Sequence, residues 1–160
     1  MILTPEEAVK MGLIKGLIDP EKQLQQAGID LTLKAVHIFE GEGIVDFDNT
    51  KRRTAPTKEL PWDDEGKIRL GQGAYKITLN ERIELPNNVI GIFFPRTTLL
   101  RSGVSVFAGL WDPGFEGWGE MLLSVQNPYG IVLYRNARVG QLMFIKENKE
   151  YKPYQGVYKG

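Results

Sequence analysis

The segment 94–103 holds the residues best suited to binding an anion. Two arginines, Arg96 and Arg101, lie in this stretch, which follows an apolar run. Thr97 and Thr98 can cap a short helix, and a helix start offers free N–H groups and a positive dipole end to a phosphate. The Arg96 guanidinium can hold a phosphate through two hydrogen bonds. A capped surface helix with two solvated arginines explains the same residues, and spacing alone slightly favours that simpler interpretation.

One carboxylate, Asp112, stands where an apolar run ends in a tight turn. The run 104–110 precedes it, Trp111 and Phe115 lie beside it, and Pro113-Gly114 follow it. A strand-end aspartate beside aromatic rings is well placed to act as a general base. Aspartate also commonly begins turns of this composition, and the segment taken alone favours that structural role.

Two further segments place a polar side chain at an expected strand. They are Ala27-Gly28-Ile29-Asp30-Leu31, with Asp30, and Arg138-Val139-Gly140-Gln141-Leu142, with Gln141. Ordinary sheet architecture accounts for each of them. The C-terminal stretch 154–160 is rich in glycine and tyrosine. It is either a disordered tail or a flexible arm that orders over a ligand and stacks a tyrosine on a base.

Composition limits the chemistry that the chain can perform. Lysine and arginine number 20 and so do aspartate and glutamate, so no net charge favours nucleic acid or an anionic membrane. The absence of cysteine excludes disulfides and thiolate chemistry, and a single histidine, His37, leaves little for serine–histidine catalysis or a multi-histidine metal site. No apolar run reaches membrane-spanning length, and the N-terminus does not resemble a signal peptide. We therefore expect a cytoplasmic protein without nucleic-acid or membrane partners.

These candidate residues must be positioned by a chain that is predicted to be mostly β-strand. Thr4-Pro5-Glu6-Glu7 predicts a capped helix start, and Asp19-Pro20 predicts a further helical turn. From Ile29 on, short alternating or apolar runs are separated by Gly, Pro and Asn. The expected strands are 30–36, 67–70, 74–79, 89–94, 104–110, 121–125, 131–134 and 141–145.

This pattern predicts one all-β domain over residues 1–160, built as a sandwich, jelly roll or barrel. The polar stretch 46–66, which contains Lys51-Arg52-Arg53, is expected to be a solvated loop.

In this order, the segments resemble the motifs of the dUTPase and dCTP deaminase superfamily. Residues 26–31 are similar to the first motif, and 95–99 to the second, with threonine where the family usually has serine. Residues 108–112, with Phe115 and a later glycine, are similar to the third, and 138–142 match the fourth. The resemblance covers nearly the whole chain. It implies a homotrimer of jelly-roll-like, distorted β-barrel subunits with a short N-terminal helix and one short inserted helix, active sites at the subunit interfaces, and a flexible arm over about residues 150–160.

The resemblance also implies a role for each matching position around the triphosphate of dUTP. Asp112 would be the base that activates water for attack on the α-phosphorus, and Thr97 would contact the phosphate bridge. Mg²⁺ would chelate the triphosphate, and Asp30 would help to order the water shell of the metal. The residues expected to bind substrate at this end are Arg96, Thr98, Arg101 and Gln141.

At the nucleoside end, the resemblance implies that Phe115 packs on the deoxyribose. The hairpin 104–110 would read the base largely through its backbone, with contacts at Val106, Phe107 and Ala108. Tyr158, on the C-terminal arm, would stack on the base.

The choice between hydrolase and deaminase depends on one acid. The N-terminal segment and Arg101 resemble the deaminase branch of the superfamily. Its deaminases need a glutamate three residues before the asparagine that ends a strand, which is Asn127 here. That position is Ser124, or Leu122 in an ungapped alignment, and Glu120 has the wrong spacing. Without this glutamate deamination lacks its proton shuttle, so the sequence predicts a dUTP diphosphatase on a deaminase-like variant of the fold.

Two departures from the family pattern keep alternatives open. The hairpin expected to read the base is shorter than in either the dUTPases or the dCTP deaminases. The C-terminal arm has Lys159 but lacks the arginine usual in the family. A dCTP deaminase or bifunctional dCTP deaminase/dUTPase is one alternative. A non-catalytic nucleotide-binding or regulatory member of the fold is the other.

Overall fold

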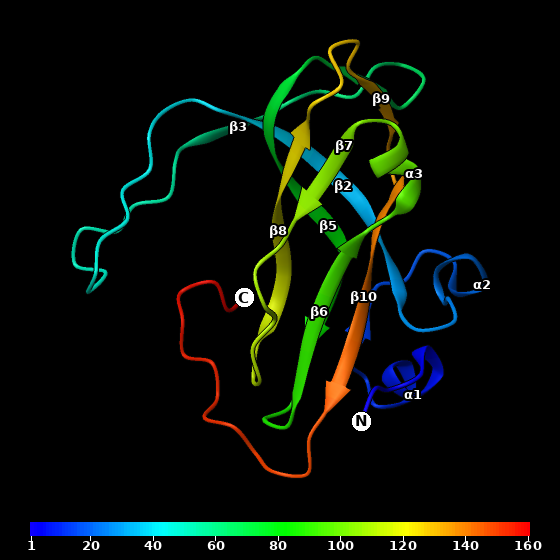
Figure 1. Ribbon diagram of the computed structural model, residues 1–160, viewed down its shortest axis with the longest axis vertical. Helices are drawn as coiled ribbons and strands as arrows, with labels where there is room; N and C mark the ends of the chain where they lie inside the picture. The colour runs from blue at the N-terminus through cyan, green and yellow to red at the C-terminus, as the bar shows by residue number, and fades with distance from the viewer.

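The computed structural model describes residues 1–160, and most of its ordered chain is β-strand. In chain order the elements are α1 (Pro5–Lys10), β1 (Ile14–Lys15), α2 (Pro20–Gln23), β2 (Ile29–Phe39), β3 (Thr57–Glu59), β4 (Lys67–Leu70), β5 (Gly73–Glu84), β6 (Val89–Pro95), α3 (Thr97–Arg101), β7 (Val104–Phe107), β8 (Glu116–Val125), β9 (Ile131–Tyr134) and β10 (Arg138–Lys146). Neighbouring strands pair antiparallel throughout. Figure 1 shows the three short helices on one side of the long strands.

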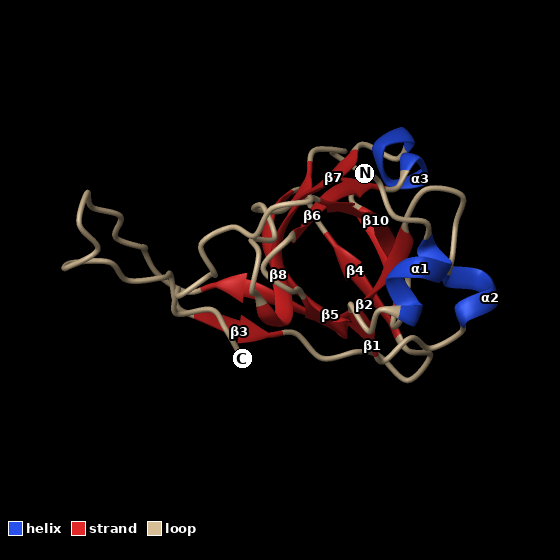
Figure 2. Cartoon of the chain, turned by 90° about the horizontal axis from the view of Figure 1, so that it is seen from below, coloured by secondary structure: helices blue, strands red, loops and turns tan.

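One sheet curls until its two ends meet. Its strand order is β6-β10-β2-β5-β8-β7, with β1 paired to β5 and β3 paired to β2. The backbones of Gly91 on β6 and Trp111 beyond β7 exchange hydrogen bonds of 3.0 and 3.1 Å, which join the ends of the sheet. The result is a nearly closed barrel, as the end-on view in Figure 2 shows. Strands β4 and β9 form a separate two-stranded sheet.

The interior of the barrel is apolar because alternate strand residues point inward. Along β8, buried and exposed positions alternate over almost the whole strand, as expected for a half-buried strand. The core includes Phe144, Leu33, Ile77 and Leu123, which are almost fully buried. The predicted all-β barrel with a short N-terminal helix and a short inserted helix, α3, is confirmed. None of the helices is long and apolar enough to cross a membrane.

The sequence signals for helix starts are correct near the N-terminus, at α1, but not at α3. At α1, the Thr4 hydroxyl accepts from the Glu7 N–H at 3.2 Å and the Glu7 carboxylate accepts from the Thr4 N–H at 2.8 Å, which is the predicted capping box. The expectation that Thr97 or Thr98 caps α3 is wrong. Both threonines already lie inside the helix, and the cap position falls on Arg96, whose side chain makes no capping hydrogen bond.

Two strands beside the barrel seam differ from their predicted bounds. β7 ends at Phe107 instead of Leu110, because the chain leaves the sheet there to reach β6 through Trp111. β8 begins at Glu116 instead of Met121, because its pairing with β5 resumes beyond a register shift. The segment before Asp112 is therefore an exposed connection and not a continuous strand.

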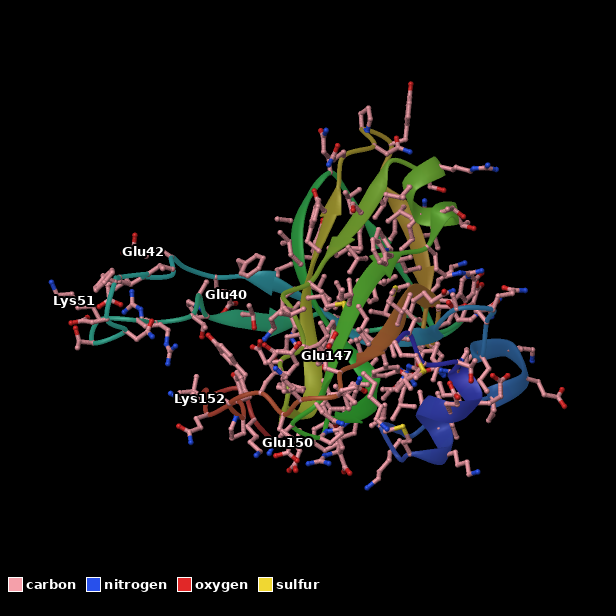
Figure 3. All side chains as sticks on the ribbon, turned by 60° about the horizontal axis from the view of Figure 1, so that its bottom comes forward. Glu40, Glu42, Lys51, Glu147, Glu150 and Lys152 are labelled. Atoms are coloured by element: carbon pink, nitrogen blue, oxygen red, sulfur yellow. The ribbon has the colours of Figure 1, made fainter.

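The polar stretch 46–66 is only partly a loop, because Thr57–Glu59 pair with β2 as strand β3. Before β3, residues 40–56 project away from the barrel, and Figure 3 labels Glu42 and Lys51 on this projection. Backbone hydrogen bonds of 2.7 and 2.9 Å between Ile44 and Arg53 hold its two sides together.

The C-terminal residues 147–160 contain no helix or strand and run back along their own barrel (red in Figure 1). The Tyr154 N–H donates to the Pro113 carbonyl at 2.7 Å, and the Gly160 N–H donates to the Glu116 carbonyl at 2.7 Å. The predicted arm therefore lies next to the start of β8.

Candidate functional site

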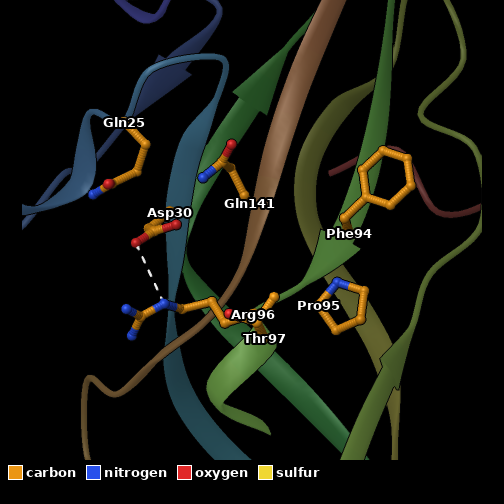
Figure 4. Close-up of a pocket in the computed structure, with 7 residues that line it drawn as sticks. All are labelled: Gln25, Asp30, Phe94, Pro95, Arg96, Thr97 and Gln141. Atoms are coloured by element: carbon orange, nitrogen blue, oxygen red, sulfur yellow. Dashed lines mark ion pairs between the residues drawn. The ribbon is translucent and has the colours of Figure 1, made fainter. Parts of the chain in front are cut away.

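A polar pocket of about 300 Å³ opens beside β2, β6 and β10. It is lined by Gln25, Asp30, Phe94, Pro95, Arg96, Thr97 and Gln141. Figure 4 shows Arg96 directed at Asp30, with the two glutamine side chains above the carboxylate. Three of the predicted motifs meet here, since Asp30, Arg96 with Thr97, and Gln141 each come from a different one.

Strand register brings three of these side chains into one row. Gln141 on β10 lies opposite Asp30 on β2 and opposite Phe94 on β6. Directly opposed residues of antiparallel strands point to the same face, so the three side chains are neighbours. Gly28 permits this arrangement, because a Cβ atom there would lie 2.7 Å from the Leu142 carbonyl oxygen. The glycine of the first motif therefore allows the start of β2 to lie close against β10.

Asp30 is a buried carboxylate held between two arginines. Its side chain is 2% exposed, and Oδ2 accepts a hydrogen bond from Arg138 Nη1 at 3.2 Å. Arg96 Nε lies 3.7 Å from the same oxygen. Burial raises the pKa of Asp30, whereas the charges of Arg96 and Arg138 and the amide of Gln141 lower it, and burial prevails. Both guanidinium groups are thus oriented before any ligand arrives.

The groups around the pocket carry more positive charge than they neutralise among themselves, and they also offer hydrogen-bond donors. Asp30 can compensate one of the two arginine charges, and it is the one carboxylate of the lining. The amides of Gln25 and Gln141 and the Thr97 hydroxyl add neutral donors. Guanidinium groups with neighbouring amide donors suit an anion that carries several oxygens, such as a phosphate chain.

Two residues of this site carry no individual role in the sequence analysis. Arg138 opens the fourth motif, and its place beside Gln141 is a signal that could have identified it. Gln25 follows α2 and has no such signal, because only the fold brings it over Asp30. Its Nε2 donates to the Lys22 carbonyl at 2.7 Å, which fixes the side chain at the pocket edge.

Thr98 and Arg101 lie outside the pocket. Thr98 lines a second hollow of about 370 Å³ between α3, β9 and β10, which shares Arg96 with the first and is also lined by Arg138. Arg101 is exposed at the C-terminal end of α3. Of the four residues predicted to act in the segment 96–101, Arg96 and Thr97 therefore line the pocket, and Thr98 and Arg101 do not.

Asp112 also lies outside the pocket lining. Its neighbour Trp111 is bonded to Gly91, near the start of β6, whereas Arg96 follows the end of that strand. A rise of about 3.3 Å per residue separates Gly91 from Arg96 by roughly 16 Å. Asp112, the predicted base, and Arg96, the arginine expected to bind phosphate, are therefore far apart in one chain.

Of the three hairpin residues expected to contact the base, one is buried and two are exposed. Val106 is 2% exposed and belongs to the core, so that only its backbone is available to a ligand. Phe107 is 53% exposed, and Ala108 is exposed beside it. These residues, like Asp112, do not line the pocket of their own chain.

The C-terminal segment covers Phe115 in the single chain. Phe115 is 8% exposed, and its ring meets that of Tyr154 edge-on with centroids 5.6 Å apart. Tyr158 is 54% exposed, and the guanidinium of Arg52, from the projecting segment, lies 5.9 Å from its ring centroid. Neither aromatic ring lines the pocket in this position of the segment.

The two positions considered for a deaminase glutamate lie on the outward face of β8. Leu122 and Ser124 share this face with Glu120. The Glu120 carboxylate forms an ion pair with Lys76 Nζ at 3.3 Å. The outward face of β8 therefore offers no unpaired acid close to Asn127.

The residues present fit a metal that arrives with its ligand. No group of three or more His, Asp and Glu side chains is arranged to hold a metal ion. Mg²⁺ is commonly bound through one or two carboxylates, phosphate oxygens and water. Asp30 is the carboxylate in the pocket that can contact such an ion through a water.

Comparison with known proteins places the chain among nucleotide enzymes. The dCTP deaminase-like family matches residues 6–147. A curated protein of Archaeoglobus fulgidus, named probable deoxyuridine 5′-triphosphate nucleotidohydrolase, is 44% identical over 151 residues, which cover 94% of this chain and 89% of that protein. The deoxyuridine 5′-triphosphate nucleotidohydrolase of Methanocaldococcus jannaschii is 38% identical over 141 residues, covering 88% of this chain and 89% of that protein.

A solved structure shares the fold. It is the 2′-deoxycytidine 5′-triphosphate deaminase from Agrobacterium tumefaciens, with a TM-score of 0.66 and 20% sequence identity over 89% of this chain. The match spans 47% of that longer chain.

Proposed function

The chain belongs to the dCTP deaminase-like family, and we propose that it hydrolyses dUTP to dUMP and diphosphate. The curated relatives that it matches over most of its length are named as hydrolases of deoxyuridine triphosphate. The observation that carries the proposal is the pocket in which Arg96, Gln141 and Asp30 meet beside Arg138. This pocket has the charge and the donors that a triphosphate requires.

In the proposed reaction, Asp112 takes a proton from a water whose oxygen attacks the α-phosphorus. A new phosphorus–oxygen bond forms, and the bond from the α-phosphorus to the oxygen that bridges it to the β-phosphorus breaks. Diphosphate leaves with the electron pair of that bond. Arg96, Arg138 and Gln141 donate to the phosphate oxygens and stabilise the negative charge of the transition state. The Thr97 hydroxyl donates to an oxygen of the departing diphosphate.

The distance between Arg96 and Asp112 favours a site shared by two copies of the chain. We place Asp112 and the hairpin 104–110 of one subunit over the pocket of its neighbour, and three such contacts close a homotrimer. Exposed apolar side chains at both edges support this arrangement, since Phe94 is 57%, Phe107 53% and Leu110 57% exposed. Large exposed apolar groups of this kind are typical of interfaces.

At the nucleoside end, the backbone around Val106 and Ala108 reads the base. Phe115 packs on the deoxyribose and Tyr158 stacks on the base only if the C-terminal segment leaves its present place. The edge-to-face contact of Phe115 with Tyr154 must then open. Substrate binding is therefore coupled to movement of residues 150–160.

Bound with the triphosphate, Mg²⁺ would supply charge neutralisation and would polarise the phosphate oxygens. Asp30 would be the residue that holds it, through a water. Arg96 and Arg138 keep that carboxylate in place, because both face Oδ2.

One assay tests the proposed function against its alternatives. The purified chain is incubated with Mg²⁺ and with dUTP, dCTP or dTTP, while diphosphate and ammonia are both measured. We expect diphosphate from dUTP and no ammonia from dCTP. Ammonia release from dCTP would identify a deaminase or a bifunctional enzyme and would overturn the inference drawn from Ser124 and Leu122. Tight binding of dUTP without any product would identify a non-catalytic member of the fold.

A further inference from the structure

Glu81 on β5 is a buried carboxylate that lies outside the pocket. Its residue is 1% exposed, and it takes part in none of the ion pairs of the structure. Burial raises the pKa of Glu81, although hydrogen bonds from Thr32 and Gln23 lower it. A buried carboxylate without a cation is costly in free energy, so hydrogen-bond partners must stabilise it. Those partners are the groups that Glu81 can hold in place.

Glu81 first secures β2 where this strand leaves β5. The β2–β5 pairing is irregular between Leu33 and Ala35, and Thr32 is instead opposite Arg138 on β10. The Oε2 atom of Glu81 accepts from the Thr32 N–H at 2.9 Å, and Oε1 accepts from the Thr32 hydroxyl at 2.5 Å. The carboxylate therefore replaces a strand partner two residues beyond Asp30.

Gln23 then connects Glu81 with the α2 turn. Its side chain is almost fully buried, and Nε2 donates to Glu81 Oε1 at 2.7 Å and to the Asp30 carbonyl at 2.9 Å. Its Oε1 accepts from the N–H groups of Ile18 at 2.7 Å and Asp19 at 3.0 Å. Both donors and both lone pairs of the amide are used, so the side chain has one fixed orientation.

The α2 turn in turn orients the pocket. The Lys22 carbonyl accepts from Arg138 Nη1 at 2.7 Å and from Gln25 Nε2 at 2.7 Å. Arg138 Nη1 also donates to Asp30 Oδ2. A displacement of the turn by about 1 Å would stretch the two bonds to Lys22 beyond hydrogen-bonding distance.

We infer that Glu81 is a positioning residue for the triphosphate pocket. Through Gln23 it holds the turn whose carbonyl orients Arg138 and Gln25, and through its bonds to β2 it holds Asp30. Glu81 touches no substrate and acts through these neighbours. The inference rests on the proposed function, because the pocket is taken to hold the phosphates of dUTP.

The test uses the full chain and two substitutions that cut the same link. In Glu81→Gln an amide NH₂ faces groups that are themselves donors, and in Gln23→Met the bridge to α2 is lost while the side chain stays similar in size. Binding of inorganic tripolyphosphate is measured by calorimetry, and KM and kcat for dUTP are measured with Mg²⁺. We expect each variant to bind tripolyphosphate about tenfold more weakly and to raise KM by a similar factor, with a smaller change in kcat.

The double variant and a surface control separate positioning from general destabilisation. Because both substitutions remove the hydrogen bond between Gln23 and Glu81, the loss of tripolyphosphate affinity in the double variant should be smaller than the sum of the losses in the two single variants. The control Glu120→Gln removes an acid from an exposed ion pair on β8 and should bind as the wild type does.

Two results would contradict the inference while leaving the proposed function intact. One is unchanged tripolyphosphate affinity and KM in both variants with only a lower melting temperature, which would show a purely structural role. The other is a fully additive loss in the double variant. A wild-type protein that neither binds tripolyphosphate nor hydrolyses dUTP would instead remove the proposed function, and the inference with it.

Discussion

Asp112 is the residue on which the proposed chemistry depends most. It is partly exposed in a turn after the barrel seam and lines no part of its own pocket. We expect Asp112→Asn to lower kcat for dUTP by about 10²- to 10⁴-fold, because an amide cannot accept the proton of the attacking water. Binding of tripolyphosphate should change little, since the pocket groups remain. Diphosphate release and calorimetry measure the two quantities.

A matched substitution controls for the loss of a negative charge. Asp64→Asn makes the same chemical change at an exposed turn residue with no hydrogen bond to its side chain, and it should keep wild-type turnover. Wild-type kcat in Asp112→Asn would mean that another group deprotonates the water.

Glu81 should leave a signature in the pH dependence of stability. Its pKa in the folded protein is raised above 4.5 by burial, so the folded state retains a proton that the unfolded state has lost. The corresponding stabilisation is present below pH 4.5 and disappears as pH rises through the folded pKa. We therefore expect the difference in unfolding free energy, wild type minus Glu81→Gln, to fall with rising pH above about 4.5. Urea unfolding at a series of pH values measures it.

Glu84, three positions along the same strand, supplies a control of opposite sign. A hydrogen bond from Lys15 holds the pKa of Glu84 below 4.5, so its contribution is lost as pH falls through the folded pKa. The difference between wild type and Glu84→Gln should thus rise with pH. A difference for Glu81→Gln that also rose with pH would show that Glu81 is not the buried acid described.

Among the elements, strands whose pattern is local could be predicted and those that depend on distant partners could not. β4 and β9 have the predicted bounds, because their alternating residues end at glycine, asparagine or other turn residues. β7 is shorter than predicted, because the chain beyond it pairs with Gly91 on β6 through Trp111, across the barrel seam. Residues 104–110 carry no signal of this distant partner, so the end of β7 could not be predicted from them.

In the candidate site, too, some residues could be predicted from the sequence and others could not. Asp30, Arg96, Thr97 and Gln141 meet as the motifs predict. Gln25 could not be predicted, because its place depends on α2, which is held by bonds to Glu81 on a strand far along the chain. Motifs therefore identify residues that line the pocket, whereas the buried residues that support it depend on long-range packing.

The junction of β6 and β10 beneath the pocket allows a test at the level of elements. At Gly140 a Cβ atom would lie 1.9 Å from the ring of Phe93 and 2.7 Å from the Phe94 carbonyl oxygen. We expect Gly140→Ala to lower the unfolding free energy by about 1–3 kcal/mol, because the two strands must separate, and to weaken tripolyphosphate binding by moving Gln141. Gly71→Ala, where a Cβ atom would meet nothing within 4 Å, should change stability by less than about 0.5 kcal/mol. Equal effects of the two substitutions in urea unfolding would contradict the close approach.

At the scale of the whole molecule, the residues of the proposed site lie in two separate parts of one chain. Arg96 and Gln141 occupy the side of the barrel next to the helices, whereas Asp112 follows Trp111, which pairs with Gly91 near the other end of β6. The apolar side chains that accompany each part, Phe94 and Phe107, are exposed and have no cover in a single chain. Assembly would complete the site and cover these residues together.

Mixing two inactive variants tests this assembly directly. In a shared site, Asp112 of an Arg96→Ala subunit meets Arg96 of an Asp112→Asn subunit, and both catalytic parts are then intact. In each mixed trimer one of the three sites joins the two intact residues, so isolated mixed trimers should show about a third of wild-type dUTP hydrolysis. The variants are co-expressed with different tags, and the mixed oligomers are isolated through both. Mixing Asp112→Asn with a chain that carries both substitutions provides no intact pair and should restore nothing. Activity of the mixed oligomers that stayed at the mean of the two single variants would place Asp112 and Arg96 in the same subunit's site.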